Sequence, residues 1–290
     1  MTDVRGVQFV AAARPTLEGA GVHLRRAFGF GKETLFDPFL LLDDFRGDDP
    51  ALYRAGFPWH PHRGIETITY MLEGEVDHGD SLGNTGTIRA GDVQWMTAGS
   101  GIIHQEMPRG DAAGRMGGFQ LWANLTARLK MMEPRYRGIT AAEIPTFEAD
   151  GAQVRVICGR LGDVSGPVHD VVIEPEYFDV ALAGGAFWRH PTPPGHTVFA
   201  YLFEGAARFD TGGRDAHGMI AAGGGTIVLL GDGEAAAVEA GDEGARFLFV
   251  SGRPLREPIA WRGPVVMNTR EELDQAWRDL DTGIFVRSRL

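Results

Sequence analysis

Thr67-Ile68-Thr69-Tyr70-Met71-Leu72-Glu73-Gly74 is a run of β-branched, aromatic and aliphatic residues that closes on a Glu-Gly turn. Residues of these types favour pleated strands, and glycine favours the turns between them. The same pattern recurs in Val93-Gln94-Trp95-Met96, Phe119-Gln120-Leu121-Trp122 and Val154-Arg155-Val156-Ile157. Short strands separated by glycine turns predict an all-β protein, built as a sandwich or a barrel.

The composition agrees with that prediction. The chain has 290 residues, enough for about two domains, and its 41 glycines are about twice the usual share. Its 17 phenylalanines and 6 tryptophans supply bulky side chains for a core. The one cysteine, Cys158, cannot form an internal disulfide, which excludes a disulfide-stapled secreted scaffold and a zinc site made of several thiolates.

The chain is acidic, with a formal net charge of −11 from 28 Lys and Arg against 39 Asp and Glu. Such a surface repels a phosphate backbone, so we expect no direct binding to DNA or RNA, whereas it permits protein partners. No apolar run reaches the roughly 18 residues of a membrane span, and the first 20 residues lack the basic-then-apolar pattern of an export signal. We therefore expect a cytoplasmic protein without a membrane segment.

The two halves of the sequence resemble each other. Tyr70-Met71-Leu72-Glu73-Gly74 matches Tyr201-Leu202-Phe203-Glu204-Gly205 at an offset of 131 residues, and the glycines that bound residues 91–99 match those that bound 223–231 at an offset of 132. Chance agreement between glycine-rich hairpins is the alternative. Two similar β-domains explain both offsets with one small gap, and we favour that interpretation.

We place the two domains at residues 1–135 and 146–290, joined by the polar, proline-punctuated stretch 132–145. The second domain is expected to end in a helix at about 269–280. Thr269 begins a Thr-x-x-Glu capping box there, and four apolar residues at helical spacing form one face that would dock on a β-domain. These residues are Leu273, Ala276, Trp277 and Leu280.

Three of the nine histidines stand in two short clusters. His60 and His62 lie at positions i and i+2, which share one face of a strand, and His104 repeats that spacing with Glu106. A single His-x-His pair on a polar strand is often merely solvated, but a second cluster of the same spacing favours a metal site. Four N and O ligands without sulfur suit Fe(II), Mn, Ni, Cu or Zn, and an octahedral ion would keep about two positions open for substrate or water.

Spacing alone leaves the carboxylate ligand open, because Glu66 shares the parity of His60 and His62 and is an alternative to Glu106. The internal repeat serves as a control. At the corresponding positions, the second half carries no side chain that binds metals; these positions are Pro191, Pro193, Ala236 and Val238. We therefore expect one metal ion per chain, in the first domain.

These motifs resemble those of the pirin family, which are bicupins of the cupin superfamily. The resemblance is most specific around the two histidine clusters, and it covers nearly the whole chain. The matching stretches are residues 36–45, 60–67, 91–108, 132–134, 254–258 and 263–269.

The resemblance implies an all-β bicupin fold, with two antiparallel jelly-roll β-barrels, a short C-terminal helix and metal in the first barrel only. It implies His60, His62, His104 and Glu106 as ligands of one divalent ion, Fe(II) first, with Mn, Ni, Cu, Co or Zn as alternatives. It also implies quercetin 2,3-dioxygenase chemistry, in which a flavonol such as quercetin reacts with O2 and CO is released. Some pirins are described as iron-dependent transcription cofactors, which implies an alternative: a non-catalytic iron-binding redox sensor that acts through protein partners.

For the catalytic interpretation, we expect Glu106 to act as the general base that takes a proton from the substrate hydroxyl. Four aromatic residues near the motifs are candidates to line an apolar pocket for a small planar polyphenol or another enol, with ordinary barrel core as the alternative. They are Trp59, Trp95, Phe119 and Trp122. A deep apolar cavity above the metal would favour catalysis, whereas a metal sealed off by side chains would favour sensing.

Overall fold

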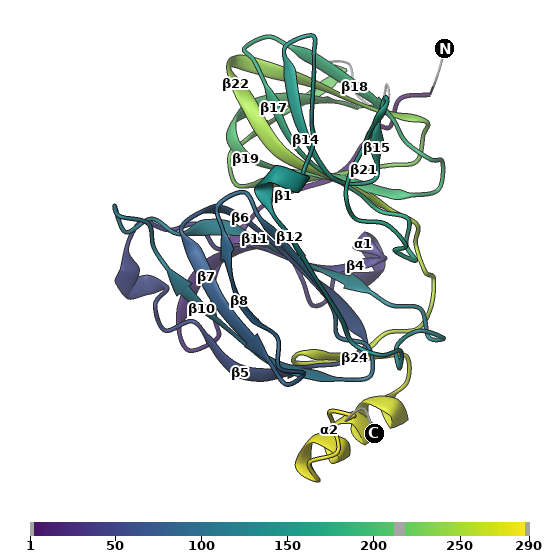
Figure 1. Cartoon of the computed structure of the whole chain (residues 1–290). Helices are drawn as coiled ribbons and strands as arrows, with labels where there is room; N and C mark the ends of the chain where they lie inside the picture. Colours follow the sequence, from purple (N-terminus) through teal and green to yellow (C-terminus); the bar gives the residue numbers. More distant parts are fainter. Residues whose placement is uncertain (1–2, 212–217, 288–290) are drawn as a thin grey trace. The chain divides into compact units, whose positions relative to one another are not determined.

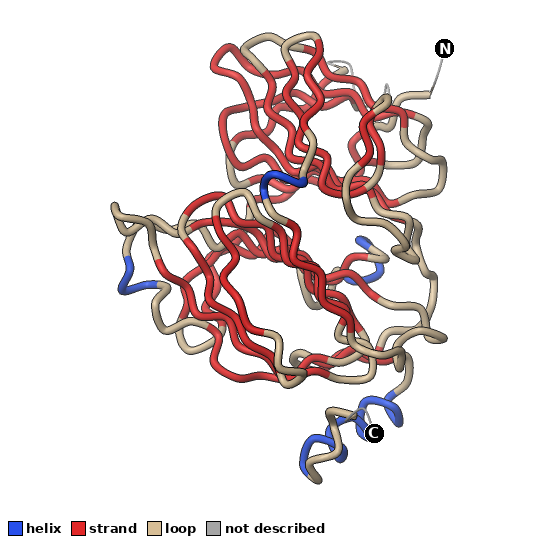
Figure 2. Tube along the Cα trace, viewed as in Figure 1, coloured by secondary structure: helices blue, strands red, loops and turns tan. Residues whose placement is uncertain are grey.

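The computed structural model describes residues 3–211 and 218–287, and strands dominate it (Figures 1 and 2). Its contacts divide the chain into two compact units that interleave in sequence. The N-terminal barrel comprises Pro15–Leu35, Phe39–Ala141 and Leu255–Leu290, and the C-terminal barrel comprises Met1–Arg14, Phe36–Pro38 and Ala142–Pro254. The predicted all-β fold of two antiparallel barrels with a C-terminal helix is confirmed.

The N-terminal barrel consists of a seven-stranded and a four-stranded antiparallel sheet. The larger sheet contains β2 (Arg14–Glu18), β3 (Val22–Phe28), β4 (Phe39–Asp44), β6 (Ile65–Glu73), β9 (Val93–Thr97), β11 (Gly117–Asn124) and β12 (Arg135–Ile139). The smaller sheet contains β5 (Phe57–His62), β7 (Glu75–Asp80), β8 (Thr85–Arg89) and β10 (Ile102–Arg109). The strand orders are β12-β9-β6-β11-β4-β3-β2 and β5-β10-β7-β8.

The C-terminal barrel repeats this plan strand for strand. Its strands are β1 (Val7–Ala12), β13 (Thr146–Ala149), β14 (Ala152–Cys158), β17 (Glu176–Leu182), β18 (Phe187–Pro191), β19 (Thr197–Asp210), β20 (Met219–Gly223), β21 (Thr226–Leu230) and β22 (Ala235–Gly252). The order is β1-β21-β19-β22-β17-β14-β13, with β18 on β22 and β20 on β19, so the long strands β19 and β22 serve in both sheets. The internal repeat predicted from the sequence is therefore present in the fold.

The remaining elements are short. They are α1 (Glu33–Phe36), the 3-10 turns η1 (Pro50–Leu52) and η2 (Ala141–Glu143), and the hairpins β15 (Arg160–Leu161) with β16 (Val164–Ser165) and β23 (Ala260–Arg262) with β24 (Val265–Met267). Within the described ranges, no helix is long and apolar enough to cross a membrane.

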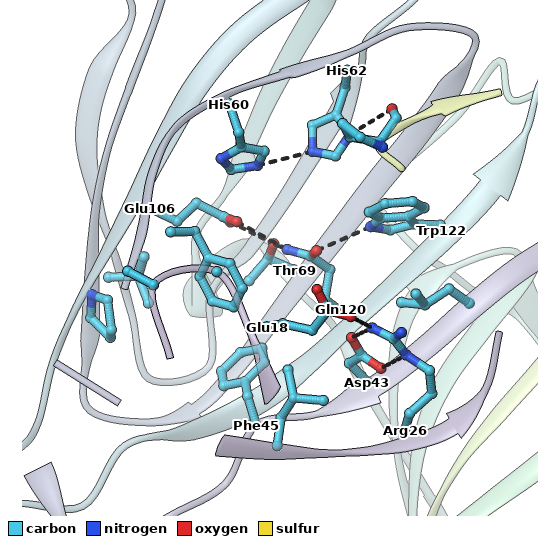
Figure 3. A pocket seen from close by; sticks show the side chains of 18 of the residues that line it. Glu18, Arg26, Asp43, Phe45, His60, His62, Thr69, Glu106, Gln120 and Trp122 are labelled. Carbon is cyan, nitrogen blue, oxygen red and sulfur yellow. Dashed lines mark hydrogen bonds and ion pairs between the residues drawn. The ribbon is translucent and has the colours of Figure 1, made fainter. Parts of the chain in front are cut away.

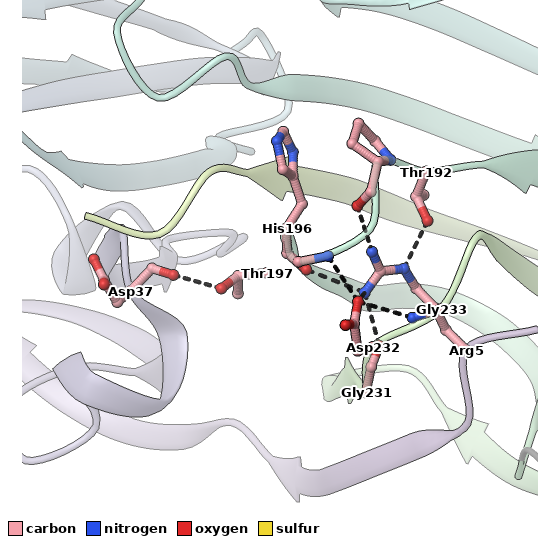
Figure 4. A network of polar contacts seen from close by, with 10 residues as sticks. Arg5, Asp37, Thr192, His196, Thr197, Gly231, Asp232 and Gly233 are labelled. Atoms are coloured by element: carbon pink, nitrogen blue, oxygen red, sulfur yellow. Dashed lines mark hydrogen bonds and ion pairs between the residues drawn. The ribbon is translucent and has the colours of Figure 1, made fainter. Parts of the chain in front are cut away.

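The limits of the two units differ from the expected domains 1–135 and 146–290. The N-terminal strand β1 pairs with β21, so it completes the C-terminal barrel. Arg5, which is 1% exposed, secures this segment because its guanidinium donates to Thr192 Oγ1 (2.6 Å) and to three main-chain carbonyls of the same barrel (Figure 4). Residues 135–139 of the expected connection form the edge strand β12, which pairs with β9.

The C-terminal helix α2 (Arg270–Asp281) begins as the capping box predicts. The Thr269 hydroxyl accepts a hydrogen bond from the Glu272 amide, and the Glu272 carboxylate accepts one from the Thr269 amide. The apolar face of the helix, with Leu273 and Ala276 buried, packs on β24. The helix therefore belongs to the N-terminal barrel instead of ending the second domain as expected, because its apolar partners lie on β24.

Candidate metal centre

Two neighbouring strands of the smaller sheet carry the three clustered histidines. The edge strand β5 accommodates Pro58 and Pro61 because one side of an edge strand has no neighbour that needs its N–H groups. In the register between β5 and β10, His60 lies opposite His104. Directly paired residues project from the same face, and His62 shares that face at i+2, so all three imidazoles meet on the inner side of the barrel.

The three imidazoles lie close together. One ring nitrogen of each lies within 4.8 Å of those of the other two, and the ring centroids are 4.4 to 5.0 Å apart. His62 and His104 are each 2% exposed. Burial and the neighbouring histidines lower the pKa of both rings well below the ordinary value, so both are neutral near pH 7 and offer lone pairs to a metal.

Hydrogen bonds fix which nitrogen faces the cluster. A carbonyl oxygen only accepts, so His60 donates its Nδ1–H to Pro58 O (2.8 Å) and His62 donates its own to Pro264 O (3.2 Å). Their Nε2 atoms therefore carry lone pairs, and they face each other at 3.1 Å. His104 Nε2 is buried and has no hydrogen-bond partner among the described residues. This donor set fits a metal ion, because one cation would satisfy all three nitrogens, and imidazole suits Fe, Cu, Ni and Zn.

Glu106 lies on β10 two residues after His104 and is 4% exposed. Its two carboxylate oxygens accept hydrogen bonds from Thr69 Oγ1 (3.2 Å) and Gln120 Nε2 (3.1 Å), and it lines the same cavity as His60 (Figure 3). In the described part of the chain, the group of close ligand atoms comprises the three histidines alone. The role of Glu106 as a fourth ligand therefore stays a prediction.

Glu66, the alternative carboxylate, lies elsewhere. It is three positions from Thr69 on β6, so the two side chains project from opposite faces of the sheet. Thr97 Oγ1 donates to Glu66 at 2.6 Å, and the side chain is not part of the cavity wall. Burial raises the pKa of this carboxyl, against the opposing effect of the hydrogen bond from Thr97. Glu106, and not Glu66, therefore lines the cavity with His60 and His62.

A cavity of about 580 Å³ opens beside the histidines. That volume lies in the range of small-molecule sites, and most of the wall is apolar. The apolar wall includes Leu24, Leu41, Phe45, Phe57, Val76, Met116, Trp122 and Trp261. Of the four aromatic candidates from the sequence, only Trp122 lines the cavity: Trp95 and Phe119 are buried in the core, and Trp59 is 55% exposed.

Trp122 also orients a polar group that sequence reasoning missed. Its ring meets that of His62 edge-on, with centroids 5.1 Å apart, and its Nε1–H donates to Gln120 Oε1 at 3.0 Å. That bond assigns the oxygen of the amide and leaves Gln120 Nε2 to donate to Glu106. Gln120 and Thr69 are paired in the register of β11 with β6, a long-range relationship that no local motif reveals.

The C-terminal barrel keeps one histidine at the equivalent place. His190 on β18 lies opposite Ala236 on β22, just as His60 lies opposite His104. The sheet register therefore equates His190, not Pro191, with His60, which corrects the sequence offset by one residue. His190 is 2% exposed and forms a hydrogen bond with a carboxylate of its own barrel. Among the described residues, no second group of metal-ligating side chains accompanies it.

The chain is similar to known proteins over nearly its whole length. The family model described as Pirin matches residues 21–123, and the one described as Pirin C-terminal cupin domain matches residues 177–286. A pirin-like protein of Caulobacter vibrioides is 45% identical over 97% of this chain and 99% of its own length. Pirin of Homo sapiens is 40% identical over 96% of this chain and 93% of its own. A crystal structure of a protein named quercetin 2,3-dioxygenase, from Acinetobacter baumannii, superposes with a TM-score of 0.87 at 33% identity and covers 97% of this chain and 98% of its own.

Proposed function

Since the chain belongs to the pirin family of bicupins, we propose that it is an iron-dependent dioxygenase that cleaves a flavonol such as quercetin with O2 and releases CO. The observation that supports this proposal is the meeting of three imidazoles, two of which line a mostly apolar cavity together with the buried carboxylate of Glu106. A redox sensor needs only the metal ligands, whereas an enzyme also needs a cavity that admits its substrate. The cavity therefore supports turnover over sensing through a protein partner.

His60, His62 and His104 would hold the ion, with Glu106 as the fourth ligand. When bound, the ion supplies Lewis acidity at a substrate oxygen and redox chemistry toward O2. The lowered pKa values of His62 and His104 keep these rings free of protons and therefore able to bind it.

Glu106 is the proposed general base. Its carboxylate takes the proton of the flavonol hydroxyl, which leaves an electron-rich ring. Thr69 donates to one oxygen of this carboxylate and Gln120 to the other, so its orientation is fixed before the substrate arrives. Trp122 holds the Gln120 amide in the required direction.

The reaction balances as follows. Both atoms of O2 enter the ring-opened ester, two carbon–carbon bonds of the flavonol break, and the carbon that bore the hydroxyl leaves as CO. The apolar wall contributes by excluding water from the electron-rich ring and by packing against the planar substrate.

The test is aerobic consumption of quercetin with detection of CO, using the iron-loaded protein beside two variants. His62→Ala removes a ligand, and His23→Ala changes an exposed histidine outside the cavity. We expect catalytic loss of quercetin with CO release in the wild type and in His23→Ala, and none in His62→Ala. Absence of turnover by the fully iron-loaded wild type would refute the proposed activity.

A further inference from the structure

A row of polar side chains crosses the inner face of the larger sheet. In the registers of neighbouring strands, Thr69 pairs with Gln120, Gln120 with Asp43, and Asp43 with Arg26. Directly paired residues project from the same face, and all four side chains line the cavity beside the histidines. Neighbouring strands are about 4.8 Å apart, so Arg26 lies roughly 10 Å across the sheet from Gln120. The row thus leads from the metal end of the cavity to its opposite end.

The far end of this row is charged (Figure 3). Arg26 donates from Nε and Nη2 to the two oxygens of Asp43, at 2.8 and 2.7 Å, and its Nη2 also lies 2.9 Å from Glu18 Oε1. Among the described residues, Arg26 Nη1 has no hydrogen-bond partner. The Asp43 side chain is 8% exposed and that of Glu18 is 40% exposed. Donors and acceptors therefore stand side by side in the cavity wall.

A second ion pair of the same kind, made by the neighbouring Asp44 of β4, lies outside the cavity. Arg46 makes the same two-pronged contact with Asp44, at 2.8 and 2.7 Å, and its side chain is 25% exposed, as that of Arg26 is. Asp44 projects from the opposite face of β4 to Asp43, and neither Asp44 nor Arg46 lines the cavity. Charged groups in a mostly apolar cavity oppose the binding of a purely apolar ligand, because they lose water when it binds. Their presence there points to a ligand with polar groups at this end.

We infer that Arg26, Asp43 and Glu18 form a subsite that recognises the hydroxyl groups on the catechol ring of a flavonol. The inference rests on the proposed function, because it assumes a flavonol anchored at the metal end. A catechol ring carries two O–H donors for carboxylate oxygens, and its oxygens accept from the guanidinium. The apolar residues Leu41 and Phe45 stand two residues on either side of Asp43 and line the same cavity, where they would cover the faces of that ring.

The experiment compares two flavonols that differ only on that ring: quercetin, which has the catechol, and galangin, which lacks both hydroxyls. Their affinities for the iron-loaded protein are measured by calorimetry without oxygen, so that no turnover occurs. We expect quercetin to bind about tenfold more tightly than galangin, a difference in line with hydrogen bonds to charged groups. Asp43→Asn and Glu18→Gln should reduce this ratio to about twofold, while Asp44→Asn, the matched control, should leave it unchanged.

Equal affinities in the wild type, or a tenfold ratio that persists in Glu18→Gln and Asp43→Asn, would overturn the subsite. Glu18 is the more exposed of the two carboxylates, so its variant tests the inference even if Asp43→Asn prevents folding. A tenfold preference without aerobic turnover would leave the subsite standing and refute the dioxygenase. Turnover of both flavonols with equal affinities would support the dioxygenase and refute the subsite. Failure of both flavonols to bind would refute both proposals.

Discussion

The Nε2 atoms of His60 and His62 lie 3.1 Å apart, and both rings commit their Nδ1 protons to main-chain carbonyls. Two lone pairs at this distance repel each other, and a shared cation turns that repulsion into attraction. We therefore expect the metal-free protein to be stabilised by Fe(II) added without oxygen. At a hundredfold excess of metal over its Kd the gain is about 2.7 kcal/mol, which should raise the midpoint of thermal unfolding by roughly 5 to 10 °C.

The control for that measurement is a pair of histidine variants. His104→Ala removes the nitrogen that is buried without a partner, so its unfolding midpoint should not respond to metal. His23→Ala should respond as the wild type does. An undiminished shift in His104→Ala would show that the metal binds elsewhere.

Glu106→Gln should separate metal binding from turnover. The amide keeps the shape of the side chain and the three histidines still bind, so most of the metal content should remain. The amide cannot take a proton, so consumption of quercetin should fall by about a hundredfold or more. Metal analysis and the aerobic assay on the same sample check both expectations.

Glu66→Gln is the matched control. Glu66 is about as buried as Glu106, but it projects from the face of β6 that points away from the cavity. We expect its turnover to stay within about threefold of the wild type. Full turnover by Glu106→Gln would remove Glu106 from the role of base.

Trp122→Phe should slow turnover without loss of metal. Phenylalanine keeps a ring beside His62 but removes the N–H that orients Gln120. The amide can then flip, so its NH2 group faces Glu106 only part of the time. One neutral hydrogen bond corresponds to roughly a fivefold effect, so we expect kcat to fall by about that factor. An unchanged kcat would mean that Gln120 is held by Thr69 and Glu106 alone.

The strands that carry the candidate metal ligands could be predicted from the sequence because their geometry is local. Spacing at i and i+2 fixes the face of His60 and His62, and it fixes that of His104 relative to Glu106. Arg26 and Gln120 could not be found in this way, because they are distant in sequence and come to the same cavity wall only through the register of β3, β4 and β11.

The same distinction holds for the fold. Capping and periodicity identify α2 from its own residues, but not the unit on which it packs. That depends on β24, which joins the N-terminal barrel through the bridge between Val265 and Arg63. Likewise, nothing within β1 indicates that its partner is β21, because strand pairing is decided by the complementary edge of a distant strand.

Lys130 makes stability depend on pH. Its ammonium donates to Gly64 O, Asn124 Oδ1 and Val266 O, and burial lowers its pKa to about 7 against the attraction of Glu257 and Glu272. The unfolded chain keeps the ordinary value of 10.5, so between pH 7 and 10.5 it binds more protons than the folded chain. Stability from this group therefore rises with pH in that window, by about 1.4 kcal/mol per pH unit.

The measurement compares urea unfolding of the wild type and Lys130→Met at pH 7.5, 8.5 and 9.5. Other groups titrate alike in both proteins, so the difference in the free energy of unfolding isolates Lys130. We expect the wild type to gain stability relative to Lys130→Met as the pH rises. A difference that does not change with pH would show that Lys130 keeps an ordinary pKa in the folded chain.

Gly64→Ala should disturb both the fold and the candidate metal site, because Gly64 follows the end of β5 and an added Cβ would meet the main chain of β24. Its φ is +80°, and a Cβ there would lie 1.9 Å from Val266 O, a main-chain atom that cannot move alone. Gly83 has a similar φ of +87° with nothing within 4 Å of a Cβ, so Gly83→Ala carries the conformational penalty of about 1 to 2 kcal/mol without the clash. We expect Gly64→Ala to lose at least about 2 kcal/mol more than Gly83→Ala in urea unfolding.

Displacement of β24 would also move Pro264, whose carbonyl holds His62, so metal affinity should weaken in Gly64→Ala alone. Equal losses of unfolding free energy in the two variants, with unchanged metal affinity in both, would show that β24 shifts without disturbing the histidines.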